Sequence, residues 1–96
     1  MIRDKVLTLL KEHAREIYAF KIQRISIFGS VARDEDSLES DIDILIKFDG
    51  PPSYDLYMDL KFYLENLLDR KVDLITEDAL RSEIKHFVER DLIRVA

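Results

Sequence analysis

Two short apolar runs on either side of a polar segment constrain the fold of this chain more than any other feature. The first run covers residues 24–28, is rich in β-branched and aromatic residues, and stops at Gly29-Ser30. The second covers residues 41–48 and opens with an Asp-x-Asp, Asp41 and Asp43. If both runs are strands, a phosphate-sized anion site and a paired-carboxylate site can lie side by side.

The second run predicts that the two aspartates act together. Side chains alternate across a strand, so Asp41 and Asp43 share one face with Leu45 and Lys47, while the other face is apolar. Residues two apart in a strand have Cα atoms roughly 6.5–7 Å apart, so both carboxylates can converge on one hard divalent cation or on a pair of them. The alternative is an exposed strand start with two solvated charges.

Gly29 and Ser30 mark the end of the first predicted strand, and residues 31–33 can form one helical turn after it. Unpaired N–H groups and the helix dipole favour phosphate at such a position. Gly29 would let phosphate oxygens approach the backbone closely, and Ser30 would add a hydroxyl donor. A Gly-Ser pair in isolation is usually just a turn.

The remaining elements are predicted from periodicity. Apolar residues recur at helical spacing over residues 2–20, 54–68 and 78–88, with Ser53 and Thr76 as helix caps. Residues 71–76 are predicted as a third strand and residues 91–95 as a terminal edge strand. Asp73 lies in the middle of the third strand, where β propensity disfavours aspartate, so a third metal-facing carboxylate would explain it.

Length and composition limit the classes of protein to which this chain can belong. A chain of 96 residues with 47% hydrophobic content fits a single domain over residues 1–96. The formal charge of -5 disfavours a polynucleotide partner. The chain has no cysteine, and no apolar run approaches the roughly 18 residues that cross a bilayer. We therefore expect a cytoplasmic protein that contacts neither nucleic acid nor membrane directly.

The motifs taken together resemble the DNA polymerase β-like nucleotidyltransferases. That family has a Gly-Ser, a helix and loop, an Asp-x-Asp and a third carboxylate one strand later, which match Gly29-Ser30, Asp41, Asp43 and Asp73 here. The Gly-Ser-x-Ala-Arg start through Arg33, the Ser40-Asp41 pair and the short chain are most similar to the minimal nucleotidyltransferases, typically paired with a HEPN-domain toxin. This chain has Asp34 where the family often has Gly.

The resemblance implies an α+β, two-layer fold with a small mixed sheet and helices packed on one face. It also implies that Asp41, Asp43 and Asp73 are catalytic and hold Mg²⁺, and that the nucleotide is bound by Gly29, Ser30, Arg33 and Ser40. Arg33 can equally serve as a structural ion pair. The implied reaction is transfer of AMP from ATP to a hydroxyl, a tyrosine in particular, of a HEPN-family toxin within a hetero-oligomer, so that the chain acts as its antitoxin.

A different class of function is also compatible with the sequence. The negative charge and the acidic run at residues 34–36 suit an antitoxin that neutralises a basic HEPN RNase by binding alone, without catalysis. Nucleotidyl transfer to a small molecule is a third reading, which the lack of sequence for an extra substrate domain disfavours. Alanine at both Asp41 and Asp43 separates the first two readings, because neutralisation by binding alone would survive it.

Overall fold

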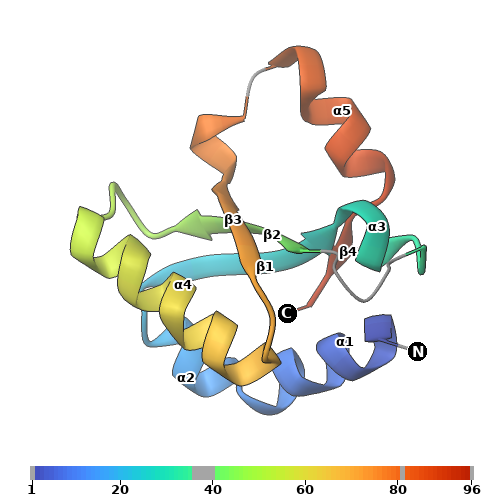
Figure 1. The fold of residues 1–96 in the computed structure, drawn as a ribbon. Helices are drawn as coiled ribbons and strands as arrows, with labels where there is room; N and C mark the ends of the chain where they lie inside the picture. The colour runs from blue at the N-terminus through green and yellow to red at the C-terminus, as the bar shows by residue number, and fades with distance from the viewer. Residues whose placement is uncertain (1, 36–40, 81, 96) are drawn as a thin grey trace.

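The computed structural model describes residues 2–35, 41–80 and 82–95, and its centre is a four-stranded mixed sheet of order β3-β2-β1-β4 (Figure 1). The two central strands, β1 (Ile22–Phe28) and β2 (Ile42–Phe48), are antiparallel. β3 (Val72–Thr76) pairs in parallel with β2, and the short β4 (Ile93–Arg94) pairs antiparallel with β1. The predicted strands are therefore confirmed, including the terminal edge strand.

One face of the sheet carries the core. Alternation along β2 buries Ile42, Ile44 and Ile46 completely, as the pattern predicted. The helices α1 (Ile2–Glu12), α2 (Ala14–Tyr18) and α4 (Tyr54–Leu68) cover this face (Figure 1). Each fully buried aliphatic side chain contributes about 1.5–3 kcal/mol, so this layer fixes the sheet that carries the polar residues on the opposite face.

The helix α4 forms for reasons that are visible in the sequence. Ser53 accepts a hydrogen bond from the Leu56 amide at 3.1 Å, which confirms the predicted N-cap. Leu60, Leu64 and Leu68 recur at helical spacing and are all buried. The helix ends where Asp69 adopts a left-handed conformation with φ 54°.

The prediction of one continuous helix over residues 2–20 was wrong. The helix breaks at His13, which has φ −107° and ψ 19°. The His13 ring Nδ1 and the His13 backbone amide both donate to the Leu9 carbonyl, at 3.0 and 3.1 Å. The apolar residues stay on one face across the break, with Leu10 and Ile17 both buried, so periodicity alone could not detect it.

The helix predicted after Thr76 is also divided. A 3₁₀ turn, η1 (Glu77–Ala79), is followed by extended backbone at Leu80 and then by α5 (Ser82–Arg90). Thr76 makes no side-chain capping hydrogen bond. As a result α5 stands away from β3, on the side of the sheet opposite α4 (Figure 1).

No helix in the described part of the chain combines the length and apolar character needed to cross a membrane.

Candidate active site

The structure brings two of the three predicted aspartates directly together. Asp43 of β2 and Asp73 of β3 are partners in the parallel pairing of these strands. Neighbouring residues in register project from the same face of a sheet, and here that is the face opposite the core. Asp43 is half-buried and Asp73 is exposed, so the pair is open to solvent on one side.

Gly29 lies against this pair. It is the first residue of the four-residue helix α3 (Gly29–Ala32), directly after Phe28, which is the register partner of Asp43 in β1. A Cβ on Gly29 would overlap Oδ2 of Asp43 and lie 3.1 Å from its Cγ. The Gly-Ser turn and the Asp-x-Asp are thus in contact, as the spacing predicted.

The electrostatics of Asp43 reflect its crowded position. Burial raises the pKa of Asp43 from 3.8 to about 6, helped by the charges of Asp73 and Asp41 and by a hydrogen bond with Asp73. Arg33 acts in the opposite direction but does not offset these effects. Carboxylates that repel one another in this way are the donor set that a hard divalent cation prefers, because the cation removes the repulsion.

The other predicted site residues are less closely gathered. Asp41 lies just before β2 and is exposed, and in the described residues no three His, Cys, Asp or Glu side chains are arranged to hold a metal ion. Ser30 follows Gly29 in α3 and is half-buried, while its carbonyl accepts from the Glu35 amide at 2.8 Å. Ser40 lies outside the described residues.

Arg33 is engaged in a structural network. Its Nε donates to Glu35 at 3.1 Å, and its Nη1 donates to Asp91 at 2.9 Å. The next residue, Asp34, has φ 63°, which is the left-handed conformation that glycine adopts most easily. The aspartate therefore takes the backbone conformation that a Gly would favour at this position.

Tyr57 is a further neighbour of Asp73. It lies on α4, and its hydroxyl donates to the Leu74 carbonyl, one residue beyond Asp73. Burial and the Asp73 charge raise the pKa of Tyr57, so the hydroxyl stays protonated and can donate at neutral pH. Tyr54, its companion in the sequence, is 77% exposed.

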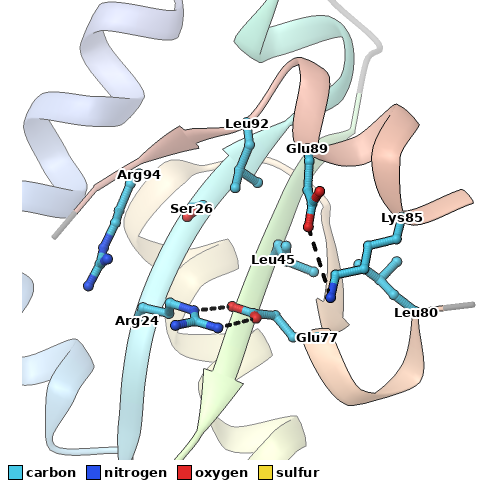
Figure 2. Close-up of a pocket in the computed structure, with 9 residues that line it drawn as sticks. All are labelled: Arg24, Ser26, Leu45, Glu77, Leu80, Lys85, Glu89, Leu92 and Arg94. Carbon is cyan, nitrogen blue, oxygen red and sulfur yellow. Dashed lines mark hydrogen bonds and ion pairs between the residues drawn. The ribbon is translucent and has the colours of Figure 1, made fainter. Parts of the chain in front are cut away.

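A pocket of about 290 Å³ opens on the same face of the sheet, beside the aspartates (Figure 2). Its floor includes Ser26 and Leu45, which are register partners, and Leu45 follows Asp43 by two residues on the same face. The other lining residues come from β1, η1, α5, β4 and the residues that flank α5: Arg24, Glu77, Leu80, Lys85, Glu89, Leu92 and Arg94.

This pocket was not predicted from the sequence. Arg24 and Glu77 form its best-defined contact, a bidentate pair in which Nε and Nη2 donate to the two carboxylate oxygens at 2.5 Å each. The pairing raises the pKa of Arg24 and lowers that of Glu77. The partners are 53 residues apart in the chain, so no local pattern could have predicted the contact.

Comparison with known proteins agrees with this geometry. Residues 7–95 match the family profile described as nucleotidyltransferase domain. A Methanocaldococcus jannaschii protein, named as a candidate protein adenylyltransferase, is 40% identical in an alignment of length 96 that covers 96% of this chain and 96% of the relative. The protein adenylyltransferase MntA of Thermococcus cleftensis is 38% identical over 92 residues, covering 96% of this chain and 91% of the relative.

Solved structures share the fold. A structure described as a candidate minimal nucleotidyltransferase has a TM-score of 0.74 at 33% identity, with 95% of this chain and 89% of that chain covered. Two more distant structures match in fold alone. One is a toxin–antitoxin with AMP-PNP, with a TM-score of 0.74, 21% identity, and coverage of 90% of this chain and 72% of that chain. The other is a tri-AMPylated Shewanella oneidensis HEPN toxin in complex with MNT antitoxin, with a TM-score of 0.65, 23% identity, and coverage of 99% and 69%.

The family profile spans nearly the whole chain, and the relatives are well above 30% identical over almost their full length. In the structure Gly29 lies against Asp43, and Asp43 is the register partner of Asp73. The chain belongs to the nucleotidyltransferase domain family, as a minimal nucleotidyltransferase homologous to the protein adenylyltransferase MntA.

Proposed function

We propose that this chain transfers AMP from ATP to a hydroxyl, a tyrosine in particular, of a HEPN-family partner protein, and that it thereby acts as an antitoxin. The observation that carries the proposal is the juxtaposition of Gly29, Asp43 and Asp73 on one open face of the sheet. Homology to protein adenylyltransferases gives the class of acceptor.

Each residue of this face has a defined role in the proposed reaction. Asp41, Asp43 and Asp73 would hold Mg²⁺, which when bound stabilises charge on the entering and leaving oxygens. Gly29 leaves the backbone accessible, so that the terminal phosphates can lie against the turn and Ser30. Ser40 is the further phosphate ligand that the family resemblance implies. Asp73, at the open side, accepts a hydrogen bond from the acceptor hydroxyl and then its proton. The hydroxyl oxygen bonds to the α-phosphorus while the bond to the β-phosphate oxygen breaks, and pyrophosphate leaves.

The partner is inferred from relatives. A fold relative was solved as an MNT antitoxin in complex with an AMPylated HEPN toxin. We therefore propose a hetero-oligomer with a HEPN-family protein as the working assembly.

The test mixes the purified protein with a HEPN-family protein, Mg²⁺ and ATP labelled at either the α- or the γ-phosphate. Label from the α position alone, found on the partner, is the expected result. Mass spectrometry then locates the modified residue, which we expect to be a tyrosine. Transfer from the γ position would identify a kinase instead and would contradict the proposal.

The alternative of an antitoxin that acts by binding alone is tested with the same components. The double variant Asp41→Ala/Asp43→Ala should form the complex but transfer no AMP. If this variant still neutralises the RNase activity of the partner as fully as the wild type, adenylyl transfer is not the basis of neutralisation.

A further inference from the structure

The outer side of α4 has no assigned role. One side of this helix packs its leucines into the core, and the other carries an apolar stripe of Tyr54, Met58 and Phe62, which we call the α4 stripe. We infer that the α4 stripe, with Asp55 and Asp59 along one edge, is the surface on which the HEPN-family partner docks. The inference rests on the proposed function and assigns the partner's place on this chain.

The α4 stripe is apolar where a solvated helix face is normally polar. Its three side chains follow one another at intervals of four residues, so they lie on one side of the helix. Tyr54 is 77% exposed and Phe62 is 53% exposed, and no other large hydrophobic side chain in the described residues is classed as exposed. Leu60 and Leu64 already supply the core contact of α4. Neighbouring apolar side chains with a polar border are typical of an interaction surface.

The charges beside the α4 stripe favour a cationic partner. Asp55 and Asp59 are both exposed, lie one helical turn apart on the same edge, and form no hydrogen bond or ion pair with a described residue. On the other edge, Lys61 lies beside Glu65, whose carboxylate accepts from the Val72 amide at 3.0 Å and is therefore engaged within the fold. The edge with the two aspartates is thus available to Lys or Arg side chains of another protein.

The same two carboxylates disfavour a second copy of this chain as the occupant. Two copies that pack antiparallel through the α4 stripe about a two-fold axis present the same patch to each other. Each residue then stays on its own edge of the interface, so Asp55 and Asp59 of both copies would line one edge together. Like charges held side by side in an interface weaken it.

The HEPN-family partner has the complementary chemistry. A ribonuclease binds a polyanion, so we expect it to carry clustered Lys and Arg side chains. An apolar surface of that protein, bordered by such cations, would cover the α4 stripe while pairing with Asp55 and Asp59. We therefore identify the occupant as an apolar surface of the partner with a basic border.

The position of α4 separates docking from catalysis. The helix covers the core face of the sheet (Figure 1), whereas Asp43 and Asp73 lie on the opposite face. A partner docked on α4 leaves these aspartates uncovered, so nucleotide can enter while the complex persists. The acceptor hydroxyl then has to lie on a segment that extends beyond the docked surface. Docking and catalysis should accordingly respond to different substitutions.

Two substitutions on α4 test the inference. Phe62→Ala removes the exposed ring, and Asp55→Lys reverses a charge in the first turn of α4. Asp4→Lys is the matched control, because Asp4 is an exposed aspartate in the first turn of another helix, α1. Urea unfolding checks the fold of each variant. Surface plasmon resonance at low and high salt gives the Kd and the association rate for the purified partner, and calorimetry gives the affinity for ATP with Mg²⁺.

We expect Phe62→Ala to weaken the complex about tenfold or more, mainly through faster dissociation, because the partner loses an aromatic contact. Asp55→Lys should weaken it about threefold or more, mainly through slower association, and should reduce the effect of salt on the association rate. Asp4→Lys should bind the partner as the wild type does, and ATP affinity should stay unchanged in all three variants. Unchanged partner affinity in folded Phe62→Ala and Asp55→Lys would overturn the inference, as would an equal loss in Asp4→Lys.

Sedimentation tests the competing occupant. The wild type and Phe62→Ala, each without partner, should sediment alike. A wild-type dimer that Phe62→Ala dissociates would assign the α4 stripe to a second copy of this chain and would overturn the inference.

Carboxylate labelling with a carbodiimide and an amine tests the inference without substitutions. Asp55 and Asp59 of the wild type should be labelled less in the complex, while the labelling of Asp4 stays the same, and protection confined to other carboxylates would overturn the inference. Binding and labelling are both read without AMP transfer. If the partner docks on α4 and receives no AMP, the proposed reaction fails while the docking surface stands. If AMP is transferred and Phe62→Ala binds the partner as tightly as the wild type, the docking surface fails while the reaction stands.

Discussion

The carboxylate of Asp43 occupies the space that a side chain on Gly29 would need. A Cβ built on Gly29 overlaps Oδ2 of Asp43, and Gly29 also has φ +76°, a conformation that L residues rarely adopt. The glycine thus meets two separate requirements: a left-handed backbone at the start of α3 and close approach to the carboxylate in β2.

Gly29→Ala should therefore harm both stability and activity. Backbone strain at positive φ costs about 1–3 kcal/mol, and the added methyl must also displace the Asp43 carboxylate. We expect a lower free energy of unfolding in urea and a loss of AMP transfer that exceeds the loss of folded protein, because a displaced carboxylate misplaces the reacting groups.

Gly50→Ala is the matched control. Gly50 has φ +106°, but a Cβ there would have no atom within 4 Å, so the substitution introduces strain without a clash. It should destabilise the protein while leaving the transfer rate per folded molecule unchanged. Equal effects of the two substitutions on the rate would show that the Gly29–Asp43 contact is irrelevant to catalysis.

The face of the sheet on which the aspartates lie could be predicted from sequence, because side chains along a strand alternate between the two faces with a period of two residues. The same alternation that buries Ile42 and Ile44 puts Asp43 on the open face beside Asp73. From the sequence we could predict that Gly29 and Asp43 lie near each other, but not how they make contact. Its detailed form depends on the β1–β2 register, which aligns Phe28 with Asp43.

The features that sequence did not predict involve individual side-chain contacts. At the break in the first helix the His13 ring donates to the Leu9 carbonyl, and the pocket is lined by the pair that joins Arg24 to Glu77. Neither contact changes the apolar periodicity from which the elements were predicted. Arg33, which the resemblance placed at the nucleotide, is paired with Glu35 and Asp91 in this structure.

Neutralising one aspartate of the pair should abolish most of the activity. Asp43→Asn and Asp73→Asn keep the shape of the side chain but remove a charged ligand, and we expect AMP transfer to fall by about 10²-fold or more. Asp49→Asn is the control, since Asp49 is exposed just beyond the other end of β2, where it accepts from Gln23 at 3.1 Å. A comparable loss of transfer in this control would point to the overall charge of the protein and not to the pair.

The raised pKa of Asp43 predicts a specific pH dependence of stability. Because its pKa is about 6 in the folded protein and near 3.8 otherwise, the folded state binds the extra proton between these values. The free energy of unfolding should therefore fall as pH rises from about 4 to 6, and Asp43→Asn should remove this slope. Asp43 is only half-buried, so solvent screening limits the effect to about 1–2 kcal/mol.

Thermal unfolding in a chelator between pH 4 and 8 measures this slope. Glu77, whose pKa Arg24 lowers, contributes in the opposite direction, with stability lost as pH falls. The difference in the pH dependence of stability between the wild type and Asp43→Asn isolates the contribution of Asp43. Adding Mg²⁺ above pH 6 should raise the unfolding temperature of the wild type alone, and an equal rise in the variant would argue against Asp43 as a ligand.

Tyr57 should stabilise β3 through its hydroxyl. Tyr57→Phe removes the hydrogen bond to the Leu74 carbonyl, so we expect the free energy of unfolding in urea to fall by about 0.5–1.5 kcal/mol. Tyr54→Phe on the same helix removes a hydroxyl from a side chain that is 77% exposed and should change stability by less than about 0.5 kcal/mol. Since Leu74 follows Asp73 in β3, Tyr57→Phe should also slow AMP transfer, though far less than Asp73→Asn does. A transfer rate equal to that of Tyr54→Phe would mean that the hydrogen bond supports the fold without positioning Asp73.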